Sequence, residues 1–531
     1  MKASEEKRYK ALSPFELKNK LISMASSNAE LTILNAGRGN PNWVTMTPRK
    51  AFFQLGEFAI QESERNPIAP EFGGFAEKKS IAKRFEQFIK KNSKKEGVQF
   101  LKIAYQYVCK NLKINGDDFI YEMVDGILGD HYPTPDRALI NCEKILHKYL
   151  EQEMCGGGKF SGKMDLFPTE GGTAAMDYIF SSLLENHLLK KGDKIALGTP
   201  IFTPYIEIPH LNDYDLVELE VKQDANLDWQ YPDTELKKLE DPKIKAFFLI
   251  HPSNPTAVMM HKKSLRKIAN LVKTKRKDLI ILTDDVYATF VNGFKSMIDV
   301  APHNTILVYS FSKYFGATGW RLGVIGIHQK NIFDDKIVKL PKKEKEELKK
   351  RYSTVVVDPA KMKFIDRMVA DSRSVALHHT AGLSTPQQVL MTLFSLFCLT
   401  DKKNNYKKQA QAITARRFKT LYDAVGIDHP YNANETHYYT TIDIPSLAEK
   451  RYSKTFREYL LSNYEPIDFV VRLAEEKSVV LMDGGGFYAP NMSVRISLAN
   501  LPDEAYIRIG KVISELLAEY YNRFEKSKKK K

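Results

Sequence analysis

The sequence predicts an α/β protein whose larger domain has a mostly parallel sheet covered by helices on both faces. Two observations support this fold class. Short, continuously apolar runs at residues 246–250 and 279–283 are typical of strands that are buried on both faces. Helical patterns separate such runs along the chain, and strands that alternate with helices favour parallel pairing.

The middle of the chain contains the elements of this sheet in order. The predicted strands cover residues 165–169, 194–197, 246–250, 279–283, 305–309 and 323–327. The first strand leads through a Gly pair into a helix at 173–189, and a crossover helix at 264–275 separates the third and fourth strands. Connections of this kind place the carboxyl ends of neighbouring parallel strands at one edge of the sheet.

The pattern changes after residue 385. A long amphipathic helix is predicted from 386 to about 425, and residues 436–444 and 493–498 alternate as half-buried strands do. We therefore predict a large domain at 61–385 and a small α+β domain at 386–525, which the N-terminal segment 1–60 joins. Two further stretches, at about 76–115 and 332–375, are predicted to be helical insertions, and residues 526–531 a disordered basic tail.

Length and net charge limit the classes of protein to which the sequence can belong. A chain of 531 residues is expected to form several domains. The formal net charge of +15 is concentrated in Lys-rich runs that also contain Glu, which is typical of solvated helix faces. The alternative, a polyanionic partner, lacks a recognisable nucleic-acid motif, so no nucleic acid is expected.

Other classes are disfavoured by what the sequence lacks. No run of about 18 uncharged apolar residues predicts a membrane span. The four cysteines are widely spaced, which argues against a disulfide framework or a zinc site. With no apolar leader at the N-terminus, we expect a cytoplasmic protein without a bound metal.

Polar motifs follow several of the predicted strands. Lys313 stands after Ser310 and Ser312 at the end of one strand. A lysine at such a position is partly desolvated, which favours the neutral amine that attacks an aldehyde. Arg321 could clamp a phosphate with its planar fork. Taken alone, this motif also suits an ordinary loop.

Three more motifs occupy the ends of other strands. Gly171, Gly172 and Thr173 open a helix, where free N–H groups favour a phosphate, although a tight turn would use the same residues. Asp284 would be a carboxylate at a buried strand end, which requires a partner such as a pyridinium N–H or a helix cap. Asn254 could donate to a phenolate oxygen, or form a turn.

Together and in this order, the motifs resemble those of the pyridoxal-phosphate aminotransferases of fold type I. The resemblance rests on Gly-Gly-Thr, Asn-Pro-Thr, Asp-x-x-Tyr and Ser-x-Ser-Lys followed by Gly-Trp-Arg-Leu-Gly, and it covers about residues 30 to 500. It implies a fold type I enzyme with a large sheet of the seven-stranded type, a smaller α+β domain and pyridoxal 5'-phosphate as the cofactor.

The resemblance also implies residue roles. Lys313 would hold the cofactor covalently and move the substrate α-proton. Asp284 would keep the pyridine nitrogen protonated. Asn254 and Tyr287 would bind the ring oxygen. Phe202 occupies the place of the aromatic that stacks on the ring. The residues expected around the phosphate are Gly171, Gly172, Thr173, Ser310, Ser312 and Arg321.

Substrate contacts and assembly are implied in the same way. Arg495 matches the arginine that binds the substrate α-carboxylate, although a solvated strand Arg would fit the local pattern equally. Arg38 and Gly39 lie in a segment that resembles one lining the substrate pocket, and Arg38 is our prediction for the distal carboxylate. Tyr132 resembles the tyrosine that reaches the phosphate of a neighbouring subunit, which implies a homo-oligomer, at least a dimer with shared active sites.

The exact residues in these motifs indicate a particular group within the family. The segments GDHYPTPDRAL, FPTEGGTAAM and SFSKYFGATGWRLGVIG are similar to those of the aspartate 4-decarboxylases, and both insertions suit that group. This similarity implies conversion of L-aspartate to L-alanine and carbon dioxide, with aspartate aminotransferase activity beside it and a large assembly of dimers. A plain aminotransferase is the alternative. A regulator that borrows this fold would need a helix-turn-helix domain, for which the first 30 residues are too short.

Overall fold

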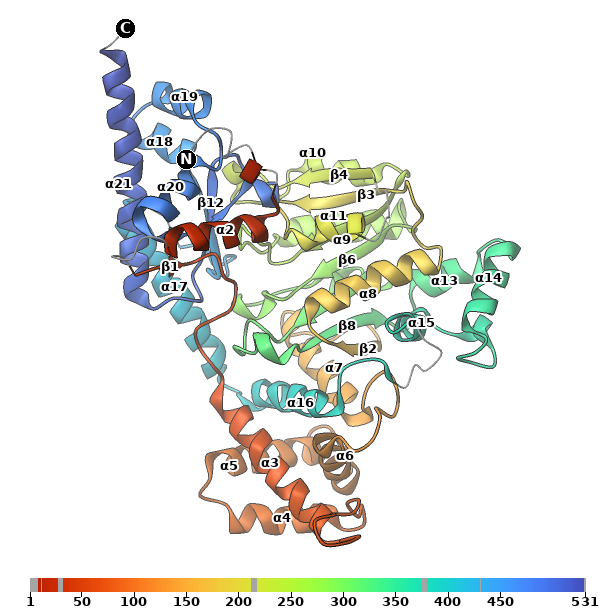
Figure 1. The fold of residues 1–531 in the computed structure, drawn as a ribbon. Coiled ribbons are helices and arrows are strands. Elements are labelled where there is room, and N and C mark those ends of the chain that lie inside the picture. Colours follow the sequence, from red (N-terminus) through yellow and green to blue (C-terminus); the bar gives the residue numbers. More distant parts are fainter. Residues whose placement is uncertain are drawn as a thin grey trace.

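A seven-stranded sheet forms the centre of the protein in the computed structural model, which describes residues 8–10, 12–26, 32–211, 217–374, 380–429 and 431–529 (Figure 1). The strand order is β2-β8-β7-β6-β5-β3-β4, and only β8 runs against the others. The strands are β2 (Met164–Thr169), β3 (Lys194–Thr199), β4 (Val217–Lys222), β5 (Ile244–Ile250), β6 (Ile280–Asp284), β7 (Thr305–Ser310) and β8 (Gly323–His328).

All six predicted strands are confirmed, each within two residues of its expected ends. Strand β4 was not predicted from the sequence, because this edge strand has the mixed sequence VELEVK and only Val221 is buried in it. The central strands are buried on both faces. Phe248 of β5 contacts Phe180 of α8 (Gly172–Glu185) on one face, whereas Phe247 belongs to the cluster with α11 (Lys262–Thr274) on the other.

The smaller domain contains a three-stranded antiparallel sheet of β9 (Tyr439–Asp443), β11 (Met482–Asp483) and β12 (Ser493–Ser497). It also contains α18 (Ile444–Arg451), α19 (Lys454–Asn463), α20 (Asp468–Lys477) and α21 (Asp503–Lys528). The expectation of a disordered tail is wrong for residues 526–528, which continue α21; residues 530 and 531 lie outside the described ones.

The single helix predicted from 386 to 425 is wrong, because the chain forms two helices there. These are α16 (Thr385–Thr400) and α17 (Asn405–Val425). The polar residues 401–404 separate them, and Asn404 adopts a left-handed conformation with φ 52°. The break lets α16 lie buried beside α7 (Ile140–Met154) in the large body, while α17 packs on α21 of the small domain.

The N-terminal segment 1–60 does not join the small domain as one unit. Its α2 (Pro14–Ser26) packs on α20, and β1 (Leu34–Asn35) pairs with β10 (Val479–Val480). By contrast, α3 (Met46–Glu64) packs with α4 (Ile81–Lys91), α5 (Glu96–Lys110), α6 (Gly116–Leu128) and α16 in a separate helical body below the sheet (Figure 1). The first predicted insertion is helical within this body, and the other domain limits remain predictions.

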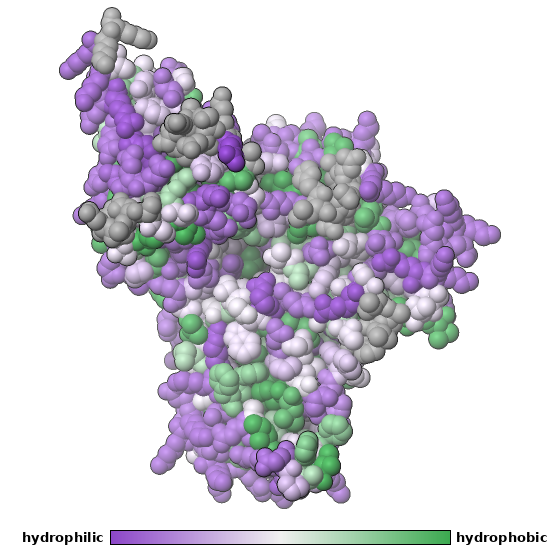
Figure 2. All heavy atoms as spheres, in the orientation of Figure 1, coloured by the Kyte–Doolittle hydropathy of each residue, from purple (hydrophilic) through white to green (hydrophobic). Residues whose placement is uncertain are grey.

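The charged runs lie on solvated surfaces. The second helical insertion contains α13 (Ile332–Val338), α14 (Lys342–Tyr352) and α15 (Phe364–Asp371), and only Leu348 and Tyr352 are buried in α14. Figure 2 shows α14 as a hydrophilic projection at the edge of the molecule. No helix in the described part of the chain combines the length and apolar character that a membrane crossing requires.

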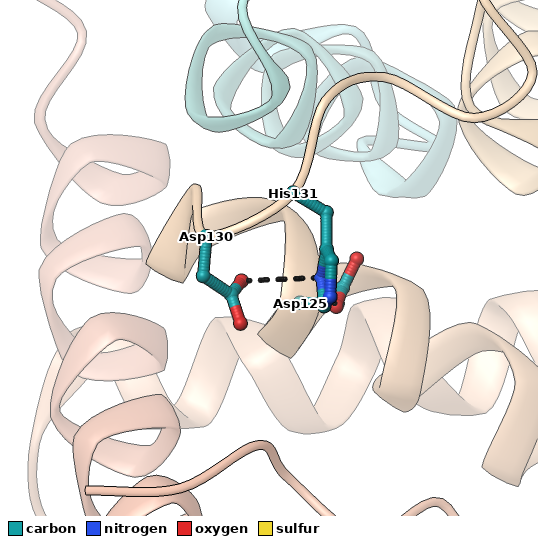
Figure 3. Close-up of side chains that lie close together, drawn as sticks. All are labelled: Asp125, Asp130 and His131. Atoms are coloured by element: carbon teal, nitrogen blue, oxygen red, sulfur yellow. Dashed lines mark hydrogen bonds and ion pairs between the residues drawn. The ribbon is translucent and has the colours of Figure 1, made fainter.

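The segment after α6 carries Tyr132 and is fixed near its start by His131. The Nδ1 atom of His131 lies 2.7 Å from Asp125 and 3.6 Å from Asp130, so two carboxylates flank the ring (Figure 3). The ring also contacts Phe75, with 4.7 Å between centroids. These contacts anchor the backbone on the amino side of Tyr132.

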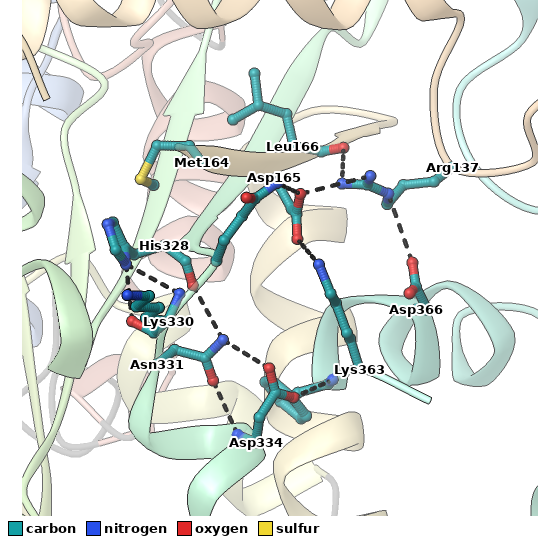
Figure 4. A network of polar contacts seen from close by, with 12 residues as sticks. Arg137, Met164, Asp165, Leu166, His328, Lys330, Asn331, Asp334, Lys363 and Asp366 are labelled. Carbon is teal, nitrogen blue, oxygen red and sulfur yellow. Dashed lines mark hydrogen bonds and ion pairs between the residues drawn. The ribbon is translucent and has the colours of Figure 1, made fainter. Parts of the chain in front are cut away.

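Arg137 anchors the same segment at its other end. Its guanidinium contacts Glu143 at 2.9 Å and Asp366 of α15 at 3.5 Å. Lys363 bonds to Asp165 of β2 at 3.0 Å (Figure 4). The second helical insertion is therefore tied both to the central sheet and to the segment that carries Tyr132.

Candidate active site

A cavity at the carboxyl ends of the strands gathers most of the predicted site residues. The predicted residues that line it are Gly39, Gly172, Thr173, Phe202, Asn254, Asp284, Tyr287, Ser310, Ser312, Lys313, Arg321 and Arg495. The sheet explains why they meet. Asp284 ends β6 and Ser310 ends β7, and the adjacent parallel strands bring both to one edge.

Asp284 is a buried carboxylate that faces this cavity with 6% of its surface exposed. Burial raises the pKa of Asp284 to about 6, against the opposing effects of the Val286 N–H, which donates to Oδ1 at 3.1 Å, and of the Lys313 ammonium. Its carboxylate shares the cavity lining with Lys313, whose ammonium charge acts on it. A buried carboxylate of this kind suits a cationic ligand group.

Lys313 enters the cavity from the turn after β7. Its Nζ atom donates to the carbonyl oxygen of Gly39 at 3.2 Å. The same carbonyl accepts a hydrogen bond from Tyr438 at 2.8 Å. The N-terminal segment, the small domain and the large domain thus meet around one amine, which is half-buried and lies within reach of a bound carbonyl compound.

The other end of the cavity is suited to a phosphate. Gly171 has φ +94°, and a β-carbon on it would clash with the Arg321 guanidinium. The first turn of α8 leaves N–H groups without helical partners beside this arginine. The hydroxyls of Ser310 and Ser312 lie 3.0 Å apart at the same end. Gly171 itself lies behind Arg321 and is not part of the cavity lining.

Arg495 is buried, so the alternative of a solvated strand arginine is wrong. Only 2% of it is exposed, and its guanidinium lies between the rings of Tyr439 and Phe487, at 4.4 and 4.8 Å from their centroids. It donates to Gly37 O at 2.8 Å, and its buried Nε has no hydrogen-bond partner in the described chain. An unneutralised arginine facing a cavity is suited to bind a carboxylate.

Besides Gly171, two predicted residues do not line the cavity. Tyr132 is 65% exposed on the segment after α6. The Arg38 side chain is exposed as well, but it lies close enough to Lys18 of α2 to influence it. Burial, followed by the charges of Arg38 and Arg495, lowers the pKa of Lys18, so these three cations lie near enough to influence one another.

Sequence reasoning missed residues that approach from outside the large domain. Phe15 of α2 lines the cavity and contacts Phe202 edge to face at 5.9 Å. Tyr439 of β9 lines it beside Arg495. The strand alternation around Tyr439 could have shown that one face is buried, but the sequence offers no signal that this face meets Lys313.

The fold and site together define an enzyme that holds a phosphate-bearing ring compound on a lysine. The comparisons agree, and the chain belongs to the class I and II aminotransferase family, whose model matches residues 158–513. A bifunctional aspartate aminotransferase and L-aspartate beta-decarboxylase from a Pseudomonas species is 49% identical over 97% of both chains. An aspartate aminotransferase from Pyrococcus horikoshii is 32% identical over 26% of this chain and 35% of its own.

Solved structures show the same fold. The aspartate aminotransferase from Thermus thermophilus with maleate has a TM-score of 0.59 and 16% identity, covering 97% of this chain and 99% of its own. A kynurenine aminotransferase candidate from Saccharomyces cerevisiae, Bna3p, has a TM-score of 0.59 and 17% identity over 98% and 99% of the two chains. The fold type I prediction is confirmed.

Enzymes of this family depend on pyridoxal phosphate, and this chain is such an enzyme. The residues present fit the cofactor. Asp284 offers a buried carboxylate to a pyridinium nitrogen, and Lys313 offers an amine to the aldehyde. Arg321 and the start of α8 offer donors to the phosphate, where a side chain on Gly171 would not fit.

Cofactor affinity is expected to fall below pH 6. The ionised form of Asp284 would bind the pyridinium, and its raised pKa of about 6 means that acid protonates it in the empty site. Binding of pyridoxal phosphate to the apoprotein should therefore weaken by up to about tenfold per pH unit below 6. Fluorescence titrations at pH 5 and 7.5 would measure this. The cofactor phosphate also titrates near pH 6, so Asp284→Asn should retain only the phosphate contribution; an unchanged pH slope in this variant would contradict the assignment.

Arg495→Lys is expected to weaken binding of the amino-acid substrate. A lysine keeps the charge but loses the fork and the stacking between Tyr439 and Phe487. A loss of about 2 kcal/mol for a buried charged contact raises KM roughly 30-fold. Steady-state kinetics would measure KM, with Arg472→Lys as the control, because Arg472 pairs with Glu476 and Glu519 away from the cavity. Equal KM values in both variants would remove Arg495 from the substrate site.

Proposed function

We propose that this enzyme removes the β-carboxylate of L-aspartate to give L-alanine and carbon dioxide, and that it transaminates aspartate as a side activity. One observation carries the proposal. The Pseudomonas relative of that bifunctional name matches 97% of this chain, including both helical insertions, whereas the Pyrococcus horikoshii aspartate aminotransferase matches only 142 residues.

The proposed reaction assigns a task to each side chain. Bound pyridoxal phosphate supplies an electron sink that takes up the electron pair released when a proton or carbon dioxide leaves. Lys313 takes the α-proton and returns it. Asp284 holds the positive charge of the ring nitrogen, while Asn254 and Tyr287 bind the ring oxygen and Phe202 stacks on the ring. Gly172, Thr173, Ser310, Ser312 and Arg321 hold the phosphate.

The substrate would lie between two basic regions. Arg495 binds the α-carboxylate, because it is the buried cation that faces the cavity without a carboxylate partner in the described residues. Arg38, next to Gly39, remains our prediction for the distal carboxylate, and its exposed side chain would turn inward when aspartate binds. Phe15 and Phe202 give the cavity an apolar lining that would restrict water, which would otherwise divert the reaction to transamination.

We further propose a cytoplasmic homo-oligomer, at least a dimer with shared active sites and a larger assembly of dimers. The exposed Tyr132 would reach the phosphate held by a neighbouring subunit. Exposed apolar side chains near the first insertion, namely Phe53, Ile68, Phe72 and Phe75, supply the surface that an assembly would cover.

Incubation with aspartate and cofactor, but without any oxo acid, tests the proposal. A decarboxylase regenerates its starting form in each cycle, so alanine should accumulate over many turnovers. A plain aminotransferase would stop after one half-reaction per site, and such a single-turnover end point would replace the proposed function by the alternative.

A further inference from the structure

Tyr439 brings a phenolic hydroxyl into the substrate region of the cavity. It comes from β9 of the small domain, is 3% exposed and lines the cavity. A β-carbon placed on Gly39 would clash with the Tyr439 hydroxyl and lie 3.2 Å from Lys313 Nζ. The hydroxyl and the lysine amine therefore flank the same small residue, one on the small-domain side and one on the large-domain side.

The proposed reaction needs two proton transfers at adjacent carbons. The α-proton is removed and returned, a task for which Lys313 is placed. A separate proton must reach the β-carbon after carbon dioxide leaves. Reprotonation at the second carbon requires a donor within hydrogen-bond reach of it, and a positioned acid raises such a rate by about 10² to 10⁴-fold.

The surroundings of Tyr439 suit a proton donor. The Tyr287 hydroxyl donates to the Tyr439 hydroxyl at 3.2 Å, so the proton of Tyr439 remains available to the cavity. The Arg495 guanidinium lies 4.4 Å from the centroid of the Tyr439 ring, so a positive charge stands beside the phenol. Observed contacts thus leave the Tyr439 proton to face the cavity and place a cation next to its ring.

We propose that Tyr439 donates the proton that forms the new C–H bond at the β-carbon, an inference that rests on the proposed decarboxylase function. The bond between the β-carbon and the departing carboxylate breaks, and carbon dioxide leaves without the bonding electron pair. That pair returns to the β-carbon as the C–H bond forms with the Tyr439 proton. Solvent returns a proton to the phenolate when the product leaves. The net consumption is one proton per aspartate.

Tyr439→Phe separates the two proton transfers experimentally. With aspartate deuterated at the α-carbon, NMR follows loss of the α-deuterium to water and appearance of alanine in the same sample. We expect α-exchange within about threefold of wild type and alanine formation reduced about 100-fold or more. Equilibrium binding of succinate, read from the visible spectrum, should be unchanged, which shows that the substrate region is intact.

Tyr438→Phe is the matched control. Its hydroxyl is one residue away but is bound to the Gly39 carbonyl and does not line the cavity, so any loss should affect both transfers equally. Equal losses of exchange and alanine formation in Tyr439→Phe, or no loss of either, would overturn the inference. Failure of the proposed function is distinguishable, because wild type itself would then form no alanine and at most one equivalent of a four-carbon oxo acid per active site.

Discussion

Lys313→Ala is expected to abolish the visible absorbance of the cofactor-bound enzyme and to slow aspartate turnover at least about 10⁴-fold. The lysine amine is the covalent attachment point and the base for the α-proton in this account, and it lies in the cavity 3.2 Å from the Gly39 carbonyl. Alanine cannot replace either role. Absorbance spectra and single-turnover kinetics would measure the two losses.

The exposed Lys339 provides the control for this variant, because it lies on the second insertion, outside the cavity lining. Lys339→Ala should keep both the spectrum and the rate. A Lys313→Ala protein that retains the visible band at its usual wavelength would show that another amine holds the cofactor.

Asp284→Asn alone is expected to reduce turnover about 10² to 10⁴-fold relative to the wild-type enzyme. The substitution keeps the shape but removes the buried negative charge that would hold a protonated ring nitrogen. Breaking a buried charge pair costs about 3–5 kcal/mol. Rates measured at saturating cofactor would separate this effect from weaker cofactor binding.

The variant Asp285→Asn is the control for Asp284→Asn, because the two aspartates are adjacent in the chain. Burial raises the pKa of Asp285 to about 8, so this carboxyl is already largely neutral at pH 7, and it does not line the cavity. Asp285→Asn should therefore retain turnover within a few-fold. If the two variants lost activity equally, the effect would come from disturbance of the strand end rather than from the charge of Asp284.

Much of the fold could be predicted because buried strands consist of apolar residues, which are visible in the sequence. Strands β5 and β6 are buried on both faces and consist of continuous apolar residues. Strand β4 was missed because an edge strand tolerates polar residues. The break between α16 and α17 was missed because the linking residues 401–404 contain neither Gly nor Pro, and only the tertiary arrangement shows that the two helices pack in different domains.

The residues of the candidate site also divide into those that local sequence patterns predicted and those that they did not. Asp284 ends β6 and Lys313 follows β7, so their convergence follows from parallel pairing. Arg321 precedes the antiparallel β8, whose start pairs with the end of β7 at the same edge. Phe15 and Tyr439 reach the cavity from the N-terminal segment and from the small domain, and no local pattern records that approach. Arg495 was predicted only through resemblance, and its burial between two aromatic rings became visible only in the structure.

Carbon tracing with aspartate labelled at the distal carboxyl tests the central claim most directly. Without any oxo acid, the account predicts one labelled carbon dioxide for each alanine formed, sustained over many turnovers per active site. Label that remains in a four-carbon oxo acid, formed in an amount no greater than that of the enzyme, would contradict the account and identify the chain as a plain aminotransferase.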